Sequence, residues 1–115
     1  MFDRLDGIEA RYEELDRLLA DPQVLSDHTR IATLAQERAE IEPIVQAYRD
    51  HKRTTQELAD ARTMIEGEKD SELRDMAYEE VETLSATLSE LEERLKKVQR
   101  LSARRLQLVR AKAMR

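Results

Sequence analysis

The sequence predicts an all-α fold, an elongated three-helix arrangement in which an antiparallel helical hairpin or coiled coil packs with an N-terminal helix. Ala, Glu, Lys, Leu and Arg supply 64 of the 115 residues, a share typical of long helices and coiled coils. Only two Gly and two Pro are present, so the chain has few places to turn. No β-branched run bounded by turn residues appears, which argues against strands. The length allows one domain at most.

The first helix is expected to run from Asp3 to Ala20. Acidic residues crowd its first turns, where negative charge suits the helix dipole. Asp21-Pro22 then ends the helix, because the residue before a proline avoids the α region. The apolar residues recur at the three- and four-residue spacing of a buried face, and they are Leu5, Ile8, Tyr12, Leu15, Leu18 and Leu19.

A second helix is expected after a turn over residues 21–27, with Ser26 or Asp27 as its N-cap. Pro43 lies inside its apolar pattern and predicts a kink or a short break. The segment 51–56 is polar throughout, so we expect it to stand in water. The apolar face comprises Ile31, Leu34, Ala35, Ile41, Ile44, Val45 and Tyr48, and resumes with Leu58, Ala61 and Ile65.

A second turn is expected over residues 66–70, with Gly67 ending one helix and Asp70 or Ser71 capping the next. The third helix has the most regular apolar seam of the chain, with steps that alternate between three and four residues as in a heptad. The helix is expected to cover residues 71–110. The seam consists of Leu73, Ala77, Leu84, Leu88, Leu91, Leu95 and Val98, with Val81 between them.

The residues that usually carry chemistry are sparse. There is no Cys, and His28 and His51 lie 23 positions apart without metal-ligand spacing, so both are expected to be solvated. Adjacent Glu pairs point about 100° apart on a helix and do not share a proton or a metal. The two Gly lie 60 positions apart, which excludes a glycine-rich phosphate loop. We therefore expect no enzyme, no metal and no cofactor.

The charge divides sharply along the chain. Residues 1–93 hold all 25 acidic residues and 11 basic ones, whereas residues 94–115 hold nine basic residues and no acid. Such a basic end predicts contact with a polyanion, with Arg94, Lys97, Arg104 and Arg105 as candidate phosphate ligands. No aromatic residue lies in this tail, so base stacking is not available. The alternatives are an anionic membrane surface, or a helix end that is solvated or folded back on the acidic body.

The N-terminus lacks a secretory signal, and no apolar stretch is long enough to cross a bilayer. We therefore expect a soluble, cytoplasmic protein that does not insert into membranes.

Two stretches resemble a known family: MFDRLDGIEARYEELDRLLADPQVLSD at the start, and EIEPIVQAYRDHK from residue 40 to 52. They are similar to the N-terminal helical domain of bacterial class I peptide chain release factors of type 1, which are associated with the stop codons UAA and UAG. The resemblance covers residues 1–95. Residues 96–115 form a basic helical tail that departs from the family pattern, because the family continues there with an acidic, glycine-rich run.

The resemblance implies a non-catalytic helical unit that docks on the ribosome, projecting toward the base of the large-subunit stalk, with rRNA contact through the basic tail as a further expectation. In the family, codon reading and peptidyl-tRNA hydrolysis belong to later domains with a Pro-x-Thr tripeptide and a Gly-Gly-Gln loop. This sequence contains neither motif. Three interpretations of this departure from the family stay open. The chain is the product of a truncated or frameshifted gene, a stand-alone homologue, or an engineered fragment.

Two other functions stay open. One is a coiled-coil scaffold that forms a homodimer through the Leu84–Leu95 seam, and the other is a polyanion-binding helical protein.

Overall fold

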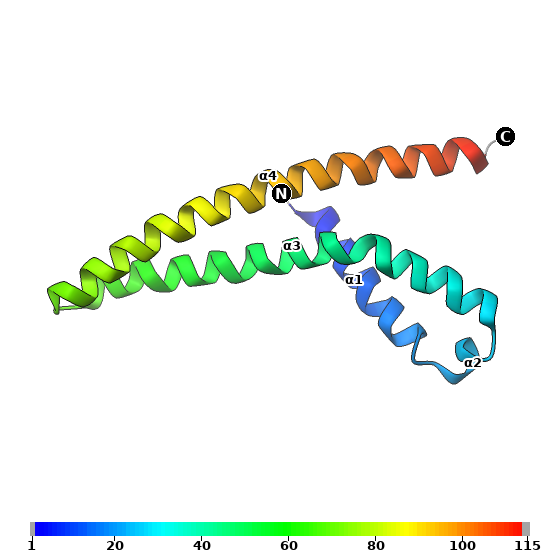
Figure 1. The fold of residues 1–115 in the computed structure, drawn as a ribbon, viewed down its shortest axis with the longest axis horizontal. Helices are drawn as coiled ribbons and strands as arrows, with labels where there is room; N and C mark the ends of the chain where they lie inside the picture. The colour runs from blue at the N-terminus through cyan, green and yellow to red at the C-terminus, as the bar shows by residue number, and fades with distance from the viewer. Residues whose placement is uncertain (1, 114–115) are drawn as a thin grey trace. The chain divides into compact units, whose positions relative to one another are not determined.

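The computed structural model describes the backbone of residues 2–113 and the side chains of residues 2–100. Every regular element within those limits is a helix: α1 (Asp3–Leu18), α2 (Pro22–Leu25), α3 (His28–Gly67) and α4 (Ser71–Ala113) (Figure 1). The predicted all-α class is confirmed. The chain forms two compact units, Met1–Tyr48 and Arg49–Arg115. Helix α3 runs through both units, and each unit is described by itself below.

Helix α1 forms where the sequence predicts it. Asp3 and Asp6 lie in its first turn and Arg17 in its last, so the side-chain charges oppose those of the helix dipole at both ends. Its predicted stripe faces inward, with Leu5, Leu15 and Tyr12 buried.

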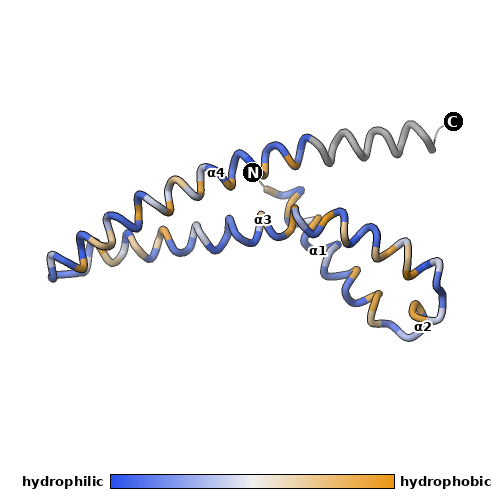
Figure 2. Tube along the Cα trace, in the orientation of Figure 1, coloured by the Kyte–Doolittle hydropathy of each residue, from blue (hydrophilic) through white to orange (hydrophobic). Residues whose placement is uncertain are grey.

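The segment after α1 differs from the prediction, because part of the expected turn is a short helix, α2. The carboxylate of Asp21 accepts a hydrogen bond from the backbone N–H of Gln23 at 2.9 Å, and Pro22 occupies the first turn, where its missing N–H costs nothing. Val24 is thereby turned inward and forms the core of the first unit with Leu15 and Leu34. Figure 2 shows hydrophobic residues in α1, α2 and the first part of α3.

Helix α3 begins after Asp27, whose side chain accepts a hydrogen bond from the N–H of Arg30 at 3.2 Å. Pro43 does not break the helix, contrary to the short break that we allowed for. The ring lies on the exposed side of α3, and so does Ala39, the residue whose carbonyl loses its partner. Water can reach that carbonyl, which lowers the cost of the missing hydrogen bond.

The second unit contains the helical hairpin made by the later part of α3 and by α4, joined by a tight turn (Figure 1). Gly67 is the last residue of α3, although no glycine in the described part of the chain has a positive φ. The Glu68 carboxylate accepts the N–H groups of Lys69 and Asp70 at 3.1 and 3.0 Å. Asp70 in turn caps α4 by accepting the N–H of Glu72 at 2.9 Å.

The predicted seam of α4 packs inward along most of its length. Its buried members are Ala77, Leu91 and Leu95, and its half-buried members are Val81, Leu84, Leu88 and Val98. Leu73 is the exception, with 44% of its surface exposed. It is the third residue of α4 and lies beside the turn.

The polar segment 51–56 also departs from the prediction. Thr54 is only 5% exposed and His51 is half-buried, so one side of this segment does not stand in water. Thr54 lies one turn before the buried Leu58, and the buried Ala61 follows Leu58 on the same side of the helix. The inward face of α3 therefore continues through a stretch that contains no large aliphatic residue.

Candidate functional site

The predicted phosphate ligands fall in two groups. Arg94 and Lys97 are exposed on α4, whereas Arg104 and Arg105 lie outside the residues whose side chains the structure describes. Successive residues turn by about 100° around a helix, so Lys97 points roughly opposite to the buried Leu95. The first two cations are thus free of the seam and able to meet a polyanion.

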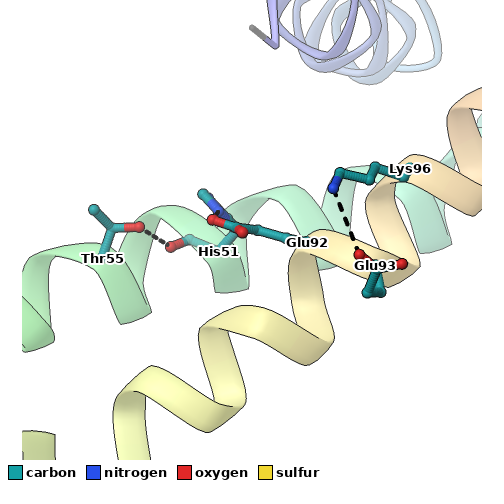
Figure 3. Close-up of polar contacts among 5 residues, drawn as sticks. All are labelled: His51, Thr55, Glu92, Glu93 and Lys96. Carbon is teal, nitrogen blue, oxygen red and sulfur yellow. Dashed lines mark hydrogen bonds and ion pairs between the residues drawn. The ribbon is translucent and has the colours of Figure 1, made fainter.

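A weak local ion pair accompanies these cations. The Nζ of Lys96 lies 3.5 Å from Oε1 of Glu93 (Figure 3), and both side chains are largely exposed. Such i,i+3 pairs contribute on the order of 0.3 kcal/mol, so this contact does not immobilise the surface.

His51 pairs across the hairpin with Glu92, which corrects the expectation that it is solvated. Its Nε2 lies 3.3 Å from Oε1 of Glu92, and only 12% of the His51 side chain is exposed (Figure 3). The carbonyl of His51 also accepts the hydroxyl of Thr55 at 2.8 Å. The two partners are 41 positions apart, so no local pattern could reveal the pair. His28 is exposed, as expected.

The second unit carries a shallow, open groove on one flank of the hairpin. Glu57, Asp60, Ala61 and Met64 of α3 line it together with Glu80 of α4. We refer to these five residues as the flank groove. It joins carboxylates to an apolar floor, and the sequence analysis did not identify it.

Groups with a shifted pKa occur in the first unit and serve its structure. The pKa of Tyr48 is raised to about 12 by its hydrogen bond to Asp6, by burial and by nearby negative charge. The pKa of Arg11 is raised, first through its hydrogen bond to Glu37. Both shifts move the group away from neutral pH, whereas a general acid or base needs a pKa close to it.

The sequence is similar to a known protein family over most of its length. The sequence model of the PCRF domain matches residues 8–104, which is most of the chain. The chain belongs to the PCRF domain family.

Three relatives of this PCRF domain carry the same name, peptide chain release factor 1. The chain is 46% identical to that of Desulforudis audaxviator over 96 residues, 42% to that of Bacillus subtilis and 41% to that of Lysinibacillus sphaericus. In each case the match covers 84% of this chain but 27% of the relative. The recognised resemblance to release factor 1 is confirmed, and the chain spans about a quarter of the length of these relatives. No solved structure matches the chain.

The PCRF match runs past residue 95, where we expect the basic tail to begin. The boundary between a domain of residues 1–95 and a tail of residues 96–115 stays a prediction.

Among the residues that the structure describes, no group of His, Asp and Glu is arranged to hold a metal ion. In the same part of the chain, no helix combines the length and apolarity needed to cross a membrane.

Proposed function

We propose that this chain is a ribosome-docking module of the release-factor type, which binds without itself reading a codon or hydrolysing peptidyl-tRNA. The observation that carries the proposal is the match of the PCRF domain over residues 8–104, together with relatives named peptide chain release factor 1. A role related to release factors follows from that membership. Action at UAA and UAG codons, in the cytoplasm, is the more specific form that we propose for the system to which the module belongs.

The 115 residues contain no Gly-Gly pair and no Pro-x-Thr tripeptide. We propose the large subunit, at the base of its stalk, as the docking site, with rRNA phosphates contacted by Arg94, Lys97, Arg104 and Arg105. Such contacts release counterions, so binding should weaken as salt rises.

The test is co-sedimentation with purified large and small ribosomal subunits at several salt concentrations. We expect association with the large subunit, competition by full-length release factor 1, and no peptide release by the chain alone on stop-codon-programmed ribosomes. Association with neither subunit, or equally with both, would contradict docking at the stalk base.

The phosphate contacts have a separate test in matched charge reversals. Arg94→Glu should weaken binding to the large subunit and reduce its salt dependence, because a phosphate contact is lost. Arg62→Glu makes the same chemical change at an exposed position on α3 and should leave binding nearly unchanged. Equal effects of the two variants would remove the assignment of Arg94 as a phosphate ligand.

Two further functions stay as alternatives. A homodimer through the Leu84–Leu95 seam has less support, because Leu91 and Leu95 are already buried within a single chain. General polyanion binding through the basic tail would appear as equal affinity for ribosomal subunits and unrelated RNA.

A further inference from the structure

Exposed apolar side chains gather near the turn of the hairpin. Met64 is 48% exposed, Leu73 44% and Met76 63%, and each lies within ten positions of the turn that joins α3 to α4. Methionine is common on surfaces that bind varied partners, because its flexible thioether adapts to their shape. Apolar side chains grouped in this way mark an interaction surface more often than isolated ones do.

These side chains line up with the flank groove. Leu73, Met76 and Glu80 follow one another at steps of three and four residues, which places them in one row along α4. Met64 and Glu80 line the groove from opposite helices. The row on α4 therefore extends the groove toward the turn with two exposed apolar side chains.

The charge around the groove is strongly negative. Residues 57–82 contain ten acidic and three basic residues. Three of the acids, Glu57, Asp60 and Glu80, line the groove itself. This charge repels nucleic acid and anionic lipid, and it attracts a polypeptide rich in Lys and Arg.

We propose that the flank groove and its extension by Leu73 and Met76 form a docking site for a basic, amphipathic segment of a partner protein. Met64, Leu73 and Met76 would receive the apolar side chains of the partner, as in the docking of an amphipathic helix into a groove. The carboxylates of Glu57, Asp60 and Glu80 would pair with its Lys and Arg side chains. The site does not depend on ribosome docking, and it is distinct from the basic surface around Arg94.

The test uses a labelled synthetic peptide of Leu and Lys, with Leu at the three- and four-residue spacing of a helix. Binding to the full chain is followed by fluorescence anisotropy. A peptide of the same composition in scrambled order tests whether apolar spacing matters. Labelled single-stranded poly(U), titrated with the protein in the absence of peptide, tests for nucleic acid. We expect the patterned peptide to bind most tightly, and Met76→Gln to leave the binding of poly(U) unchanged.

Charge reversal provides a matched pair of variants. Glu80→Lys should weaken peptide binding about tenfold, because an attractive contact becomes a repulsive one. Glu82→Lys makes the same change two residues later, about 200° around α4, and should weaken binding less than about twofold. Met76→Gln, which nearly preserves side-chain length and helix propensity, should weaken binding about threefold or more. Circular dichroism shows whether each variant keeps its helices.

Several results would overturn the proposal. These are equal effects of Glu80→Lys and Glu82→Lys, equal binding of the scrambled peptide, or a loss of poly(U) binding in Met76→Gln as large as its loss of peptide binding. Sedimentation of the protein alone could give a further contrary result. A dimer that Glu80→Lys abolishes would show that the groove binds a second copy of the chain. None of these outcomes affects co-sedimentation with ribosomal subunits. A failure of the peptide-docking proposal can therefore be told apart from a failure of the ribosome-docking proposal.

Discussion

Aromatic residues of the first unit combine apolar packing with polar contacts. The Tyr48 hydroxyl donates a hydrogen bond to the carboxylate of Asp6, and its ring meets Phe2 edge-on with centroids 6.0 Å apart. The guanidinium of Arg38 lies 4.6 Å from the centroid of the Tyr12 ring and donates to the Tyr12 hydroxyl at 2.7 Å. Buried tyrosines commonly find such partners, since an unpaired hydroxyl in the core is costly.

The Tyr48 contact predicts a pH dependence at high pH. The folded protein holds the pKa of Tyr48 at about 12, above its usual value of 10.0, because the protonated hydroxyl donates to Asp6. The stabilisation is therefore fully present below pH 10 and is lost as pH rises through about 12. In a tyrosinate absorbance titration, Tyr48→Phe should remove the step at about 12, whereas Tyr78→Phe, at an exposed tyrosine, should keep it. A step that survives Tyr48→Phe would contradict the assignment.

A second prediction concerns the core of the first unit. Leu15 is fully buried, with Val24 and Leu34 as its buried neighbours. Leu15→Ala should lower the free energy of unfolding by about 2–5 kcal/mol, through lost burial and the cavity left behind. Leu25 is 49% exposed, and Leu25→Ala should change stability by about 0.5 kcal/mol or less. Urea unfolding measures both, and similar midpoints for the two variants would be inconsistent with this core.

At the scale of elements, the helices depend on side chains at their ends and on which face meets the core. Asp21, Asp27 and Asp70 each accept backbone N–H groups at the first turn of a helix. Removing such a cap typically costs about 1 kcal/mol. Helix α3 is unusual because it continues through Pro43. A substitution at this position shows how much stability the helix loses by containing a proline.

Pro43→Ala should stabilise the protein. Alanine restores an N–H donor inside α3 and removes a residue that is about 3 kcal/mol less favourable than Ala within a helix. Greater freedom of the unfolded chain offsets part of this gain, so we expect the free energy of unfolding to rise by about 1–2 kcal/mol. Pro22→Ala is the control, since proline is well tolerated in the first turn of α2, and it should give no increase. Chemical denaturation followed by circular dichroism distinguishes the two, and a loss of stability in Pro43→Ala would refute the argument.

At the scale of the whole chain, opposite charges occupy different stretches. The acidic region around the hairpin turn and the basic residues from Arg94 onward belong to the same unit. If α4 is straight, residues 75 and 100 lie about 37 Å apart along it, well beyond the Debye length of about 8 Å at physiological salt. The two regions are therefore able to act on different partners, a basic polypeptide at one and a polyanion at the other.

The burial of the seam predicts the oligomeric state. Because Leu91 and Leu95 are already covered within one chain, we expect a monomer of 13.4 kDa in sedimentation equilibrium. Leu84→Asp should then destabilise the folded chain rather than dissociate an oligomer. A stable dimer that Leu84→Asp converts into folded monomer would instead support the coiled-coil scaffold.

The sequence by itself determined the helical class, the approximate positions of α1, α3 and α4, a turn within residues 66–70 and most of the inward-facing residues of α4. These features depend on interactions within about four residues, such as helix propensity, capping and periodic apolar spacing. The first 52 residues were also sufficient to identify the resemblance to release factor 1, because the order and spacing of their motifs are specific.

Only the tertiary structure decided which distant residues meet. Tyr48 and Asp6 are 42 positions apart, and His51 and Glu92 are 41 apart. Their contact depends on the register in which helices pack, which no local pattern encodes. The same register buries Thr54 in a polar segment and leaves Leu73 exposed near the turn. The flank groove also depends on this register, because one side of it comes from α3 and the other from α4. These two segments are apart in the sequence and meet only when the helices pack.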